Sequence, residues 1–374
     1  MLGLYIHIPF CLKKCGYCDF CSYPGSDDSV MLAYTQELCR RLRLRAADCR
    51  DRQVDTVYFG GGTPTLLPLA AFELLFGTLT ECYRLTPDCE ITVECNPATA
   101  DREYLTALRR LGVNRLSIGL QSAHEDELRC LGRSHSVLDF TVAVSDARAS
   151  GFDNISVDLM YGIPNQTKES FRQSLEFLCE LSPEHISAYG LKIEEGTSFY
   201  RHQNELVLPN EEEEYEIYLL LIDYLNERGY GQYEISNFSR PHRESRHNLR
   251  YWLGQEYLGF GVAAHSYFDG ERFGNSRDLA AFLRGEDIVC ERTPVSAQER
   301  DREYIMLSLR LCQGLSLSEF ARRFRKPLEA LFPAVNDLIR AKYLQIRGDF
   351  LSFTPAGFFV SNTILAQLLS AVEE

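Results

Sequence analysis

The sequence predicts an α/β protein built on an incomplete barrel of six β/α units, followed by a small helical domain that resembles a winged helix. Short β-rich runs alternate with longer helical patterns through the first half of the chain, which is typical of β/α units around a parallel sheet. From about Val295 onward, three helical segments precede a hairpin pattern. We therefore expect three regions: residues 1–205 for the partial barrel, 206–294 for a barrel extension rich in aromatic residues and histidines, and 295–374 for the C-terminal domain.

Six segments of the first region have the composition and length of strands. The helical patterns between them end at typical stop signals, such as Gly151 after the helix expected up to Ala149. The expected strands are Leu4–Pro9, Val54–Phe59, Glu90–Cys95, Arg115–Leu120, Asn154–Met160 and His185–Leu191, and the expected helices include Val30–Leu44, Arg102–Leu111 and Leu138–Ala149.

The alternation fails after about residue 205. The acidic run from Glu211 to Glu214 follows Pro209-Asn210, and carboxylates near a helix N-terminus offset the helix dipole, so we interpret this run as a helix start. A loop-rich, aromatic region is expected from Gly229 to Gly274. The tail is expected to form helices over Gln298–Leu311, Leu317–Phe324 and Leu328–Ala341, then a hairpin of Leu344–Arg347 and Phe350–Thr354.

Composition restricts the class of partner and the compartment. The formal net charge of −14 comes without a basic stretch, so we expect no nucleic-acid binding, and the C-terminal domain is expected to dock or cover a site instead. No apolar stretch is long enough to span a bilayer, and a strand pattern begins by Leu4 where a signal peptide would lie. Most of the 13 cysteines stand alone, as buried reduced thiols do. We expect a cytoplasmic protein, able to approach a membrane peripherally during delivery.

Cys11, Cys15 and Cys18 form the most specific motif of the chain. The spacing Cys-X3-Cys-X2-Cys places three thiolates around one cubic iron–sulfur cluster and leaves its fourth iron open to a small molecule. A structural zinc site is the alternative, but it needs four closed ligands. His7 would have to supply the fourth ligand from a strand, and Cys21 would break the spacing. The motif therefore favours the cluster.

Polar residues follow the expected strands at the rim where barrel proteins hold their functional groups. Gly60-Gly-Gly-Thr-Pro-Thr65 follows the second strand and lets backbone groups approach a ligand, although a plain tight turn has the same composition. Buried carboxylates and amides need partners, which loop backbone or a ligand could supply. These groups are Glu94 and Asn96 after the third strand, Gln121 and Ser122 after the fourth, Asp158 on the fifth, and Arg133, which is either a carboxylate partner or a surface residue.

A second candidate site lies in the aromatic region. Tyr233-Glu-Ile-Ser-Asn-Phe238 is followed by Arg246-His247-Asn248-Leu-Arg-Tyr251-Trp252, which contains the only tryptophan. An imidazole beside flat apolar faces is what haem requires. From spacing alone, an aromatic subcore in which His247 only donates or accepts hydrogen bonds is favoured. His265 is a second candidate ligand.

These segments together resemble the HemN-type branch of the radical S-adenosylmethionine (SAM) superfamily. The resemblance runs along almost the whole chain, including the tail. It implies a [4Fe-4S] cluster on the three cysteines that holds the amino and carboxylate groups of SAM on its fourth iron, and whose reduction cleaves SAM to a deoxyadenosyl radical. The positions it implies for SAM binding are Tyr5, Tyr17, Gly61, Gly62, Thr63, Glu94, Gln121, Arg133 and Asp158.

The branch contains oxygen-independent coproporphyrinogen III oxidases (HemN) and haem chaperones (HemW). The chain resembles the chaperones in three respects. Ten residues precede Cys11, where the oxidases carry a long extension; Phe20 stands where they have a fourth cysteine; and His247 begins a His-Asn-X-X-Tyr-Trp signature. The resemblance thus implies haem as cargo, held by His247, Asn248, Tyr251 and Trp252.

The expected function is haem binding and transfer to haem-dependent, respiratory proteins. The resemblance also implies an electron donor that reduces the cluster, and association of two copies of the chain as a homodimer. Two enzymatic alternatives stay open, coproporphyrinogen oxidation and another radical SAM reaction such as methyl transfer or porphyrin ring opening. No catalytic residue is assigned.

Overall fold

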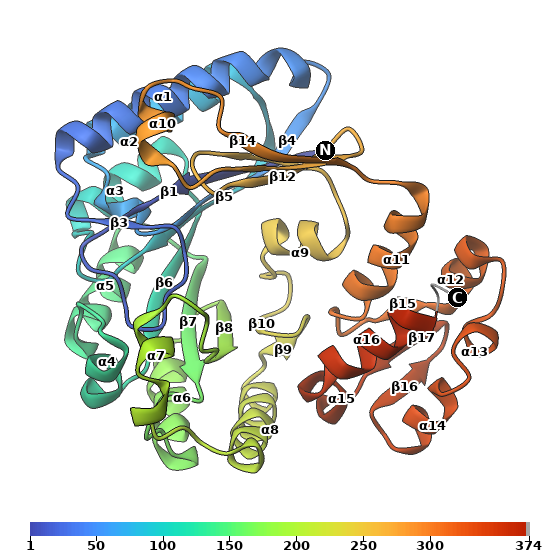
Figure 1. Cartoon of the computed structure of the whole chain (residues 1–374). Coiled ribbons are helices and arrows are strands. Elements are labelled where there is room, and N and C mark those ends of the chain that lie inside the picture. The colour runs from blue at the N-terminus through green and yellow to red at the C-terminus, as the bar shows by residue number, and fades with distance from the viewer. Residues whose placement is uncertain (372–374) are drawn as a thin grey trace.

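A computed structural model of the chain describes residues 1–371 and contains a curved sheet of twelve strands with helices on its outer face (Figure 1). The strand order is β14-β13-β12-β11-β1-β4-β5-β6-β7-β8-β10-β9, and the pairs from β11 to β8 are all parallel. The predicted α/β partial barrel is therefore confirmed. Its six central strands are β1 (Leu2–Ile8), β4 (Gln53–Gly61), β5 (Arg84–Cys95), β6 (Arg115–Gln121), β7 (Ile155–Tyr161) and β8 (His185–Gly190).

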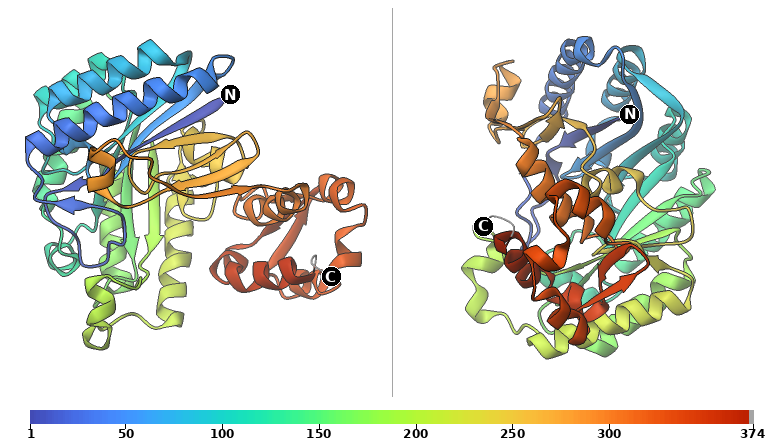
Figure 2. Two further views of the ribbon diagram at one scale, coloured as in Figure 1. Left: turned by 45° about the horizontal axis from the view of Figure 1, so that its top comes forward. Right: turned by 90° about the vertical axis from the view of Figure 1, so that its right-hand side faces the viewer.

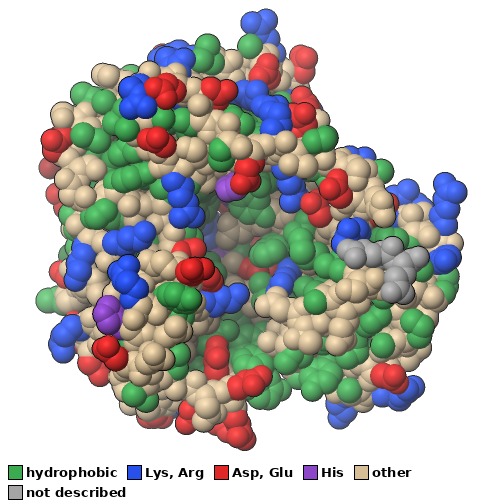
Figure 3. Space-filling view, viewed as in Figure 1, with side chains coloured by type: hydrophobic (Ala, Val, Ile, Leu, Met, Phe, Trp, Pro, Cys, Tyr) green, Lys and Arg blue, Asp and Glu red, His purple; other side chains and the backbone are tan. Residues whose placement is uncertain are grey.

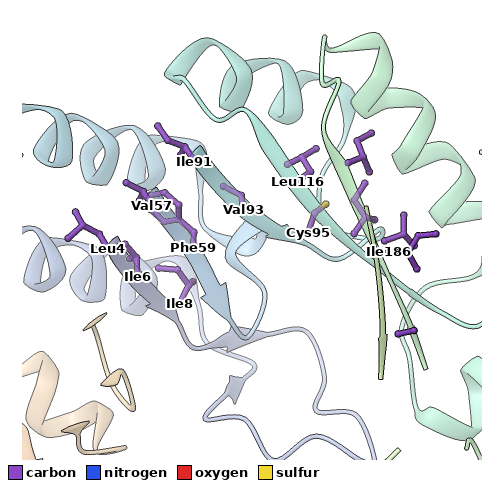
Figure 4. Packing of buried hydrophobic residues seen from close by; sticks show 14 of the residues in the cluster. Leu4, Ile6, Ile8, Val57, Phe59, Ile91, Val93, Cys95, Leu116 and Ile186 are labelled. Carbon is purple, nitrogen blue, oxygen red and sulfur yellow. The ribbon is translucent and has the colours of Figure 1, made fainter. Parts of the chain in front are cut away.

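Alternation along these strands separates the core from the barrel interior. In β1, the side chains of Leu4, Ile6 and Ile8 are fully buried on the helix-covered face (Figure 4), and Tyr5 and His7 lie on the opposite face. The outer layer consists of α1 (Asp28–Ala46), α2 (Leu69–Cys82), α3 (Arg102–Leu111), α4 (Glu125–Leu131), α5 (Val137–Ala149) and α6 (Lys168–Glu180), with short 3-10 turns η1 (Ala47–Cys49) and η2 (Pro64–Leu66).

The region after residue 205 extends the sheet at both ends. The predicted helix start is confirmed, because Asn210 caps α8 (Glu211–Glu227) and Glu213 completes a capping box. The predicted loop-rich character of 229–274 is wrong, since this segment contains several strands. One of them, β11, pairs with β1, although the two strands lie about 250 residues apart in the sequence. The elements here are α7 (Ser198–Arg201), η3 (Gln203–Glu205), β9 (Gly231–Gln232), β10 (Asn237–Ser239), α9 (Arg246–Trp252), β11 (Tyr257–Phe260), β12 (His265–Phe268), β13 (Glu271–Asn275), α10 (Leu279–Leu283) and β14 (Val289–Pro294).

The C-terminal domain follows β14 and stands to one side of the barrel (Figure 2). One predicted helix, Leu328–Ala341, is wrong as a single element: Pro333 lacks an amide donor, and the chain breaks into α13 and α14 around it. The domain contains α11 (Ala297–Ser308), β15 (Leu315–Ser316), α12 (Leu317–Phe324), α13 (Leu328–Leu331), α14 (Val335–Arg340), β16 (Leu344–Arg347), β17 (Phe350–Phe353), α15 (Pro355–Phe359) and α16 (Ser361–Ala371).

Backbone and aromatic contacts join this domain to the barrel. The amide of Ile235 donates to the carbonyl of Arg310, and the amide of Cys312 donates to that of Tyr233. The Phe359 ring packs 5.0 Å from that of Tyr215 on α8. Within residues 1–371, no helix has the length and apolar character needed to cross a bilayer.

Candidate functional site

The cysteine loop lies at the carboxyl ends of the barrel strands. It leaves β1 through β2 (Phe10–Cys11) and returns through β3 (Tyr23–Pro24), which pairs with β2. Its middle is held by Gly16, whose amide donates to the carbonyl of Leu131 and whose carbonyl accepts from the amide of Phe199. The three thiols of Cys11, Cys15 and Cys18 are half-buried and face one cavity of about 160 Å³.

This cavity collects side chains from five strands or the loops that follow them. Of the residues implied for the cluster and SAM, it is lined by Cys11, Cys15, Tyr17, Cys18, Gly61, Gly62, Thr63, Glu94, Gln121, Arg133 and Asp158. Tyr5 lies outside it. In the described part of the chain, no three His, Cys, Asp or Glu side chains are grouped so as to hold a single metal ion. A cubic cluster instead spreads its ligands over different irons.

Local geometry fits a cofactor that binds close to backbone and carries carboxylate or sulfide acceptors. A Cβ on Gly62 would come within 2.6 Å of the Phe10 carbonyl oxygen and 3.0 Å of Cys11 Sγ, so only glycine leaves this approach open. Arg133 places one guanidinium nitrogen 3.9 Å from Cys15 Sγ, while its buried Nε has no partner. An unpaired buried donor is costly, which makes this guanidinium available to a bound acceptor.

Two partly buried carboxylates line the cavity. Glu94 accepts hydrogen bonds from Tyr58 Oη (2.9 Å) and from the Gly61 amide (3.0 Å), and Asp158 accepts one from Ser117 Oγ (3.2 Å). Burial, then the charge of Asp158, raises the pKa of Glu94 to about 7. Burial likewise raises the pKa of Asp158. Carboxylates that resist ionisation this way gain from a cationic ligand.

Three alternate residues of β6 line the cavity, namely Ser117, Gly119 and Gln121. Gln121 has φ of +70°, a left-handed conformation that is rare for a residue with a side chain, and it lies at an irregularity between β6 and β7. Sequence reasoning missed Ser117. The signal was available, because residues at intervals of two share one face of a strand and Gln121 was already a candidate.

The predicted haem motif lies on α9, a short helix on the concave side of the sheet (Figure 1) that contacts β1, β4 and β5. His247 is 1% exposed, and both ring nitrogens have partners: Nδ1 lies 2.9 Å from Thr56 Oγ1 and Nε2 lies 2.9 Å from Tyr251 Oη. Burial, then Arg250, lowers the pKa of His247 to about 3, so the ring is neutral. In this conformation neither nitrogen is free to bind iron.

Three further contacts hold α9 in the interior. Ser245 caps the helix, while Glu90 on β5 accepts from the amides of Arg246 and His247 at 3.0 and 2.9 Å. Arg250 is 2% exposed and forms an ion pair with Asp55 on β4. These buried partners fix the orientation of the helix, and with it the directions of Tyr251 and Trp252.

The two aromatic residues of the motif face different cavities. Tyr251 lines a cavity of about 290 Å³ together with Tyr5, Phe20 and His265. Trp252 lines a larger cavity of about 710 Å³, bounded by α8, α9 and the C-terminal domain. Figure 3 shows the molecule hollowed between barrel and C-terminal domain, with hydrophobic side chains along the hollow. The structure thus does not bring the four predicted haem residues into a single cavity wall.

Two family models match the chain. Residues 5–178 match the radical SAM superfamily, and residues 295–360 match the HemN C-terminal domain. The first match begins within β1 and ends before β8, and the second begins directly after β14 and ends before α16.

Similarity to curated relatives extends over nearly the whole chain. The heme chaperone HemW of Bacillus subtilis is 34% identical over 99% of both chains, and that of Escherichia coli is 34% identical over 99% of this chain and 98% of its own. The solved structure of coproporphyrinogen III oxidase (HemN) from Escherichia coli, described as a radical SAM enzyme, superposes with a TM-score of 0.85, covering 99% of this chain and 89% of that one. At 24% identity, that match shows the shared fold.

Proposed function

This chain belongs to the HemW family of the radical SAM superfamily, and on that basis we propose that it binds haem and transfers it to haem-dependent proteins. The observation that carries the proposal is the similarity to heme chaperones along 99% of the chain, which includes α9 and the C-terminal domain as well as the barrel. Respiratory haem proteins are the acceptors we propose, in a reducing cytoplasm.

The cysteine cavity is the proposed cofactor site. Cys11, Cys15 and Cys18 would hold a [4Fe-4S] cluster, and the remaining lining residues would hold SAM, with Arg133 directed at an acceptor and Glu94 at a cationic group. When bound, the cluster supplies an open iron to which the amino and carboxylate groups of SAM attach. Burial raises the pKa of Cys11, and that of Cys18 to about 11, so cluster assembly releases thiol protons. An electron donor for the cluster and a homodimer are part of the proposal.

The motif of His247, Asn248, Tyr251 and Trp252 on α9 is the proposed haem-binding element, and residues on different faces of this helix have different roles. Tyr251 and Trp252 present aromatic surface to cavities, and Asn248 lies on the Trp252 side of the helix one turn earlier. His247 positions Tyr251 through the Nε2 to Oη contact. We therefore propose that His247 supports the haem site in this conformation as a positioning residue.

SAM affinity of the cluster-loaded protein is expected to rise with pH between about 6 and 8. The pKa of Glu94 is about 7, so its carboxyl group is neutral below this window and anionic above it, where it stabilises the positive charge of SAM. Glu94→Gln is expected to lose this pH dependence and to bind SAM about tenfold more weakly at pH 8. Anaerobic calorimetry measures both, with the exposed Glu81→Gln on α2 as control.

Without SAM, the same carboxyl group affects folding in the opposite direction. Its folded pKa lies above the ordinary 4.5, so its contribution to stability is present at low pH and is lost as pH rises through about 7.

A Glu94→Gln variant whose SAM affinity still rises across pH 7 would contradict the assigned contact between Glu94 and SAM.

The chaperone and oxidase functions make opposite predictions for one anaerobic reaction. Reduced, cluster-loaded protein is mixed with SAM and coproporphyrinogen III, and methionine, deoxyadenosine and protoporphyrinogen are quantified. We expect no protoporphyrinogen, together with saturable binding of about one haem per chain in a parallel titration. Protoporphyrinogen formed in proportion to deoxyadenosine would establish the oxidase instead, and SAM cleavage triggered by another substrate would establish a different radical reaction.

A further inference from the structure

The cavity beside the cysteine loop contains a free imidazole at its rim. His265 begins β12 and is exposed, and its ring makes no hydrogen bond within the described residues, in contrast to the fully paired ring of His247. The buried rings of His7 and His185 are likewise paired at both nitrogens. Among these histidines, only His265 combines a cavity position with unoccupied ring nitrogens.

The walls of this cavity have the chemistry of a tetrapyrrole site. Tyr5, Tyr251 and Tyr257 provide aromatic surface, and the Tyr251 and Tyr257 rings pack edge to face at 4.6 Å. Arg277 stands exposed at the cavity without an ion pair in the described chain, and a guanidinium suits a carboxylate. The lining also includes one exposed carboxylate, Asp19.

Phe20 connects this cavity to the cofactor site. Its side chain is 62% exposed and lines both the 290 Å³ cavity and the cysteine cavity. A large apolar ring in this position is available to contact a ligand. The 290 Å³ cavity accommodates part of a macrocycle and leaves the rest exposed, as a carrier that must release its cargo requires.

We propose that His265 is the axial ligand of haem iron in this chain, with Tyr5, Tyr251 and Tyr257 against the macrocycle and Arg277 paired with a propionate. This assignment rests on the proposed haem-carrier function and adds the ligand and the cavity to it. Neutral imidazole is a common haem-iron ligand, and the aromatic wall with one free cation matches a macrocycle that is apolar apart from its carboxylates.

The backbone under His265 offers a second, independent perturbation. A Cβ on Gly274, which pairs with His265 across β12 and β13, would come within 2.9 Å of His265 Cε1 and 3.0 Å of its Nδ1. The imidazole is the free end of a side chain, so Gly274→Ala is expected to displace the ring while preserving the strand pair. This variant keeps the imidazole and changes only its position.

Haem titration of cluster-loaded protein, followed by the haem absorption band, tests the assignment. His265→Ala is expected to weaken haem binding about tenfold or more and to remove the spectrum of histidine ligation, which added imidazole restores. Gly274→Ala is expected to shift the band with a smaller loss of affinity, and Arg277→Gln to weaken binding without changing the band. The exposed His202→Ala serves as control.

The outcomes separate this assignment from the function on which it rests. Saturable haem binding by wild type together with an unchanged band and affinity in His265→Ala would overturn the His265 assignment alone, and would direct attention to the cavity at Trp252. Absence of saturable binding by wild type would overturn the carrier function itself. Circular dichroism of His265→Ala verifies that the variant is folded.

Discussion

Cys15→Ala is expected to abolish the iron–sulfur cluster and leave the protein folded. A cubic cluster with only three protein ligands does not tolerate the loss of one, so iron content should fall from about four atoms per chain to near zero, with loss of the cluster's broad visible absorption. The fold should persist because the loop lies at the barrel rim and its thiols are half-buried. Iron analysis and thermal unfolding of anaerobically reconstituted protein measure the two effects.

Cys179→Ala is the matched control, because this half-buried thiol lies on α6, away from the cavity. It should retain full iron content. Retention of the cluster in Cys15→Ala, or equal loss in the control, would contradict the assignment of the motif.

Arg250→Ala is expected to destabilise the fold by about 3–5 kcal/mol. The guanidinium is 2% exposed and pairs with Asp55, and it also donates to the Glu256 carbonyl at 3.2 Å, so its removal leaves a largely buried carboxylate without its main partner. Since this contact holds α9 against β4, haem binding should weaken in proportion to the loss of folded protein. Urea denaturation measures the free energy of unfolding.

The same helix provides the control. Arg246 is 40% exposed, pairs with Asp88 at 3.3 Å near the surface, and reaches Asp55 only at 3.9 Å, so Arg246→Ala should cost less than about 1 kcal/mol. Comparable destabilisation by the two variants would show that burial of the Arg250 pair does not anchor α9.

The parallel barrel was predictable because its signals are local. Alternating buried positions such as Leu4, Ile6 and Ile8 mark a strand, and Gly151 marks the end of α5. Non-local pairing was not predictable: nothing within Tyr257–Phe260 indicates that this segment lies beside β1. The break at Pro333 was predictable in principle, since proline disfavours helix at the preceding residue.

The candidate site shows the same division. The cysteine spacing is visible in the sequence itself, and the expected ends of the strands indicate the rim positions of Glu94 and Arg133. The structure brings these residues to one cavity. Whether His247 has free ring nitrogens depends on Thr56 and Tyr251, and Thr56 belongs to a segment remote in sequence. Sequence patterns cannot show that competition for the imidazole, and it is this competition that distinguishes His247 from His265.

Haem transfer tests the central claim most directly. Cluster-loaded protein carrying one haem is mixed anaerobically with an excess of an apo haem protein, and the absorption band of the acceptor is followed over time. The carrier function predicts near-complete transfer at a rate that exceeds release of haem to buffer and depends on acceptor concentration. Transfer no faster than spontaneous release, or haem retained by the chain, would contradict it.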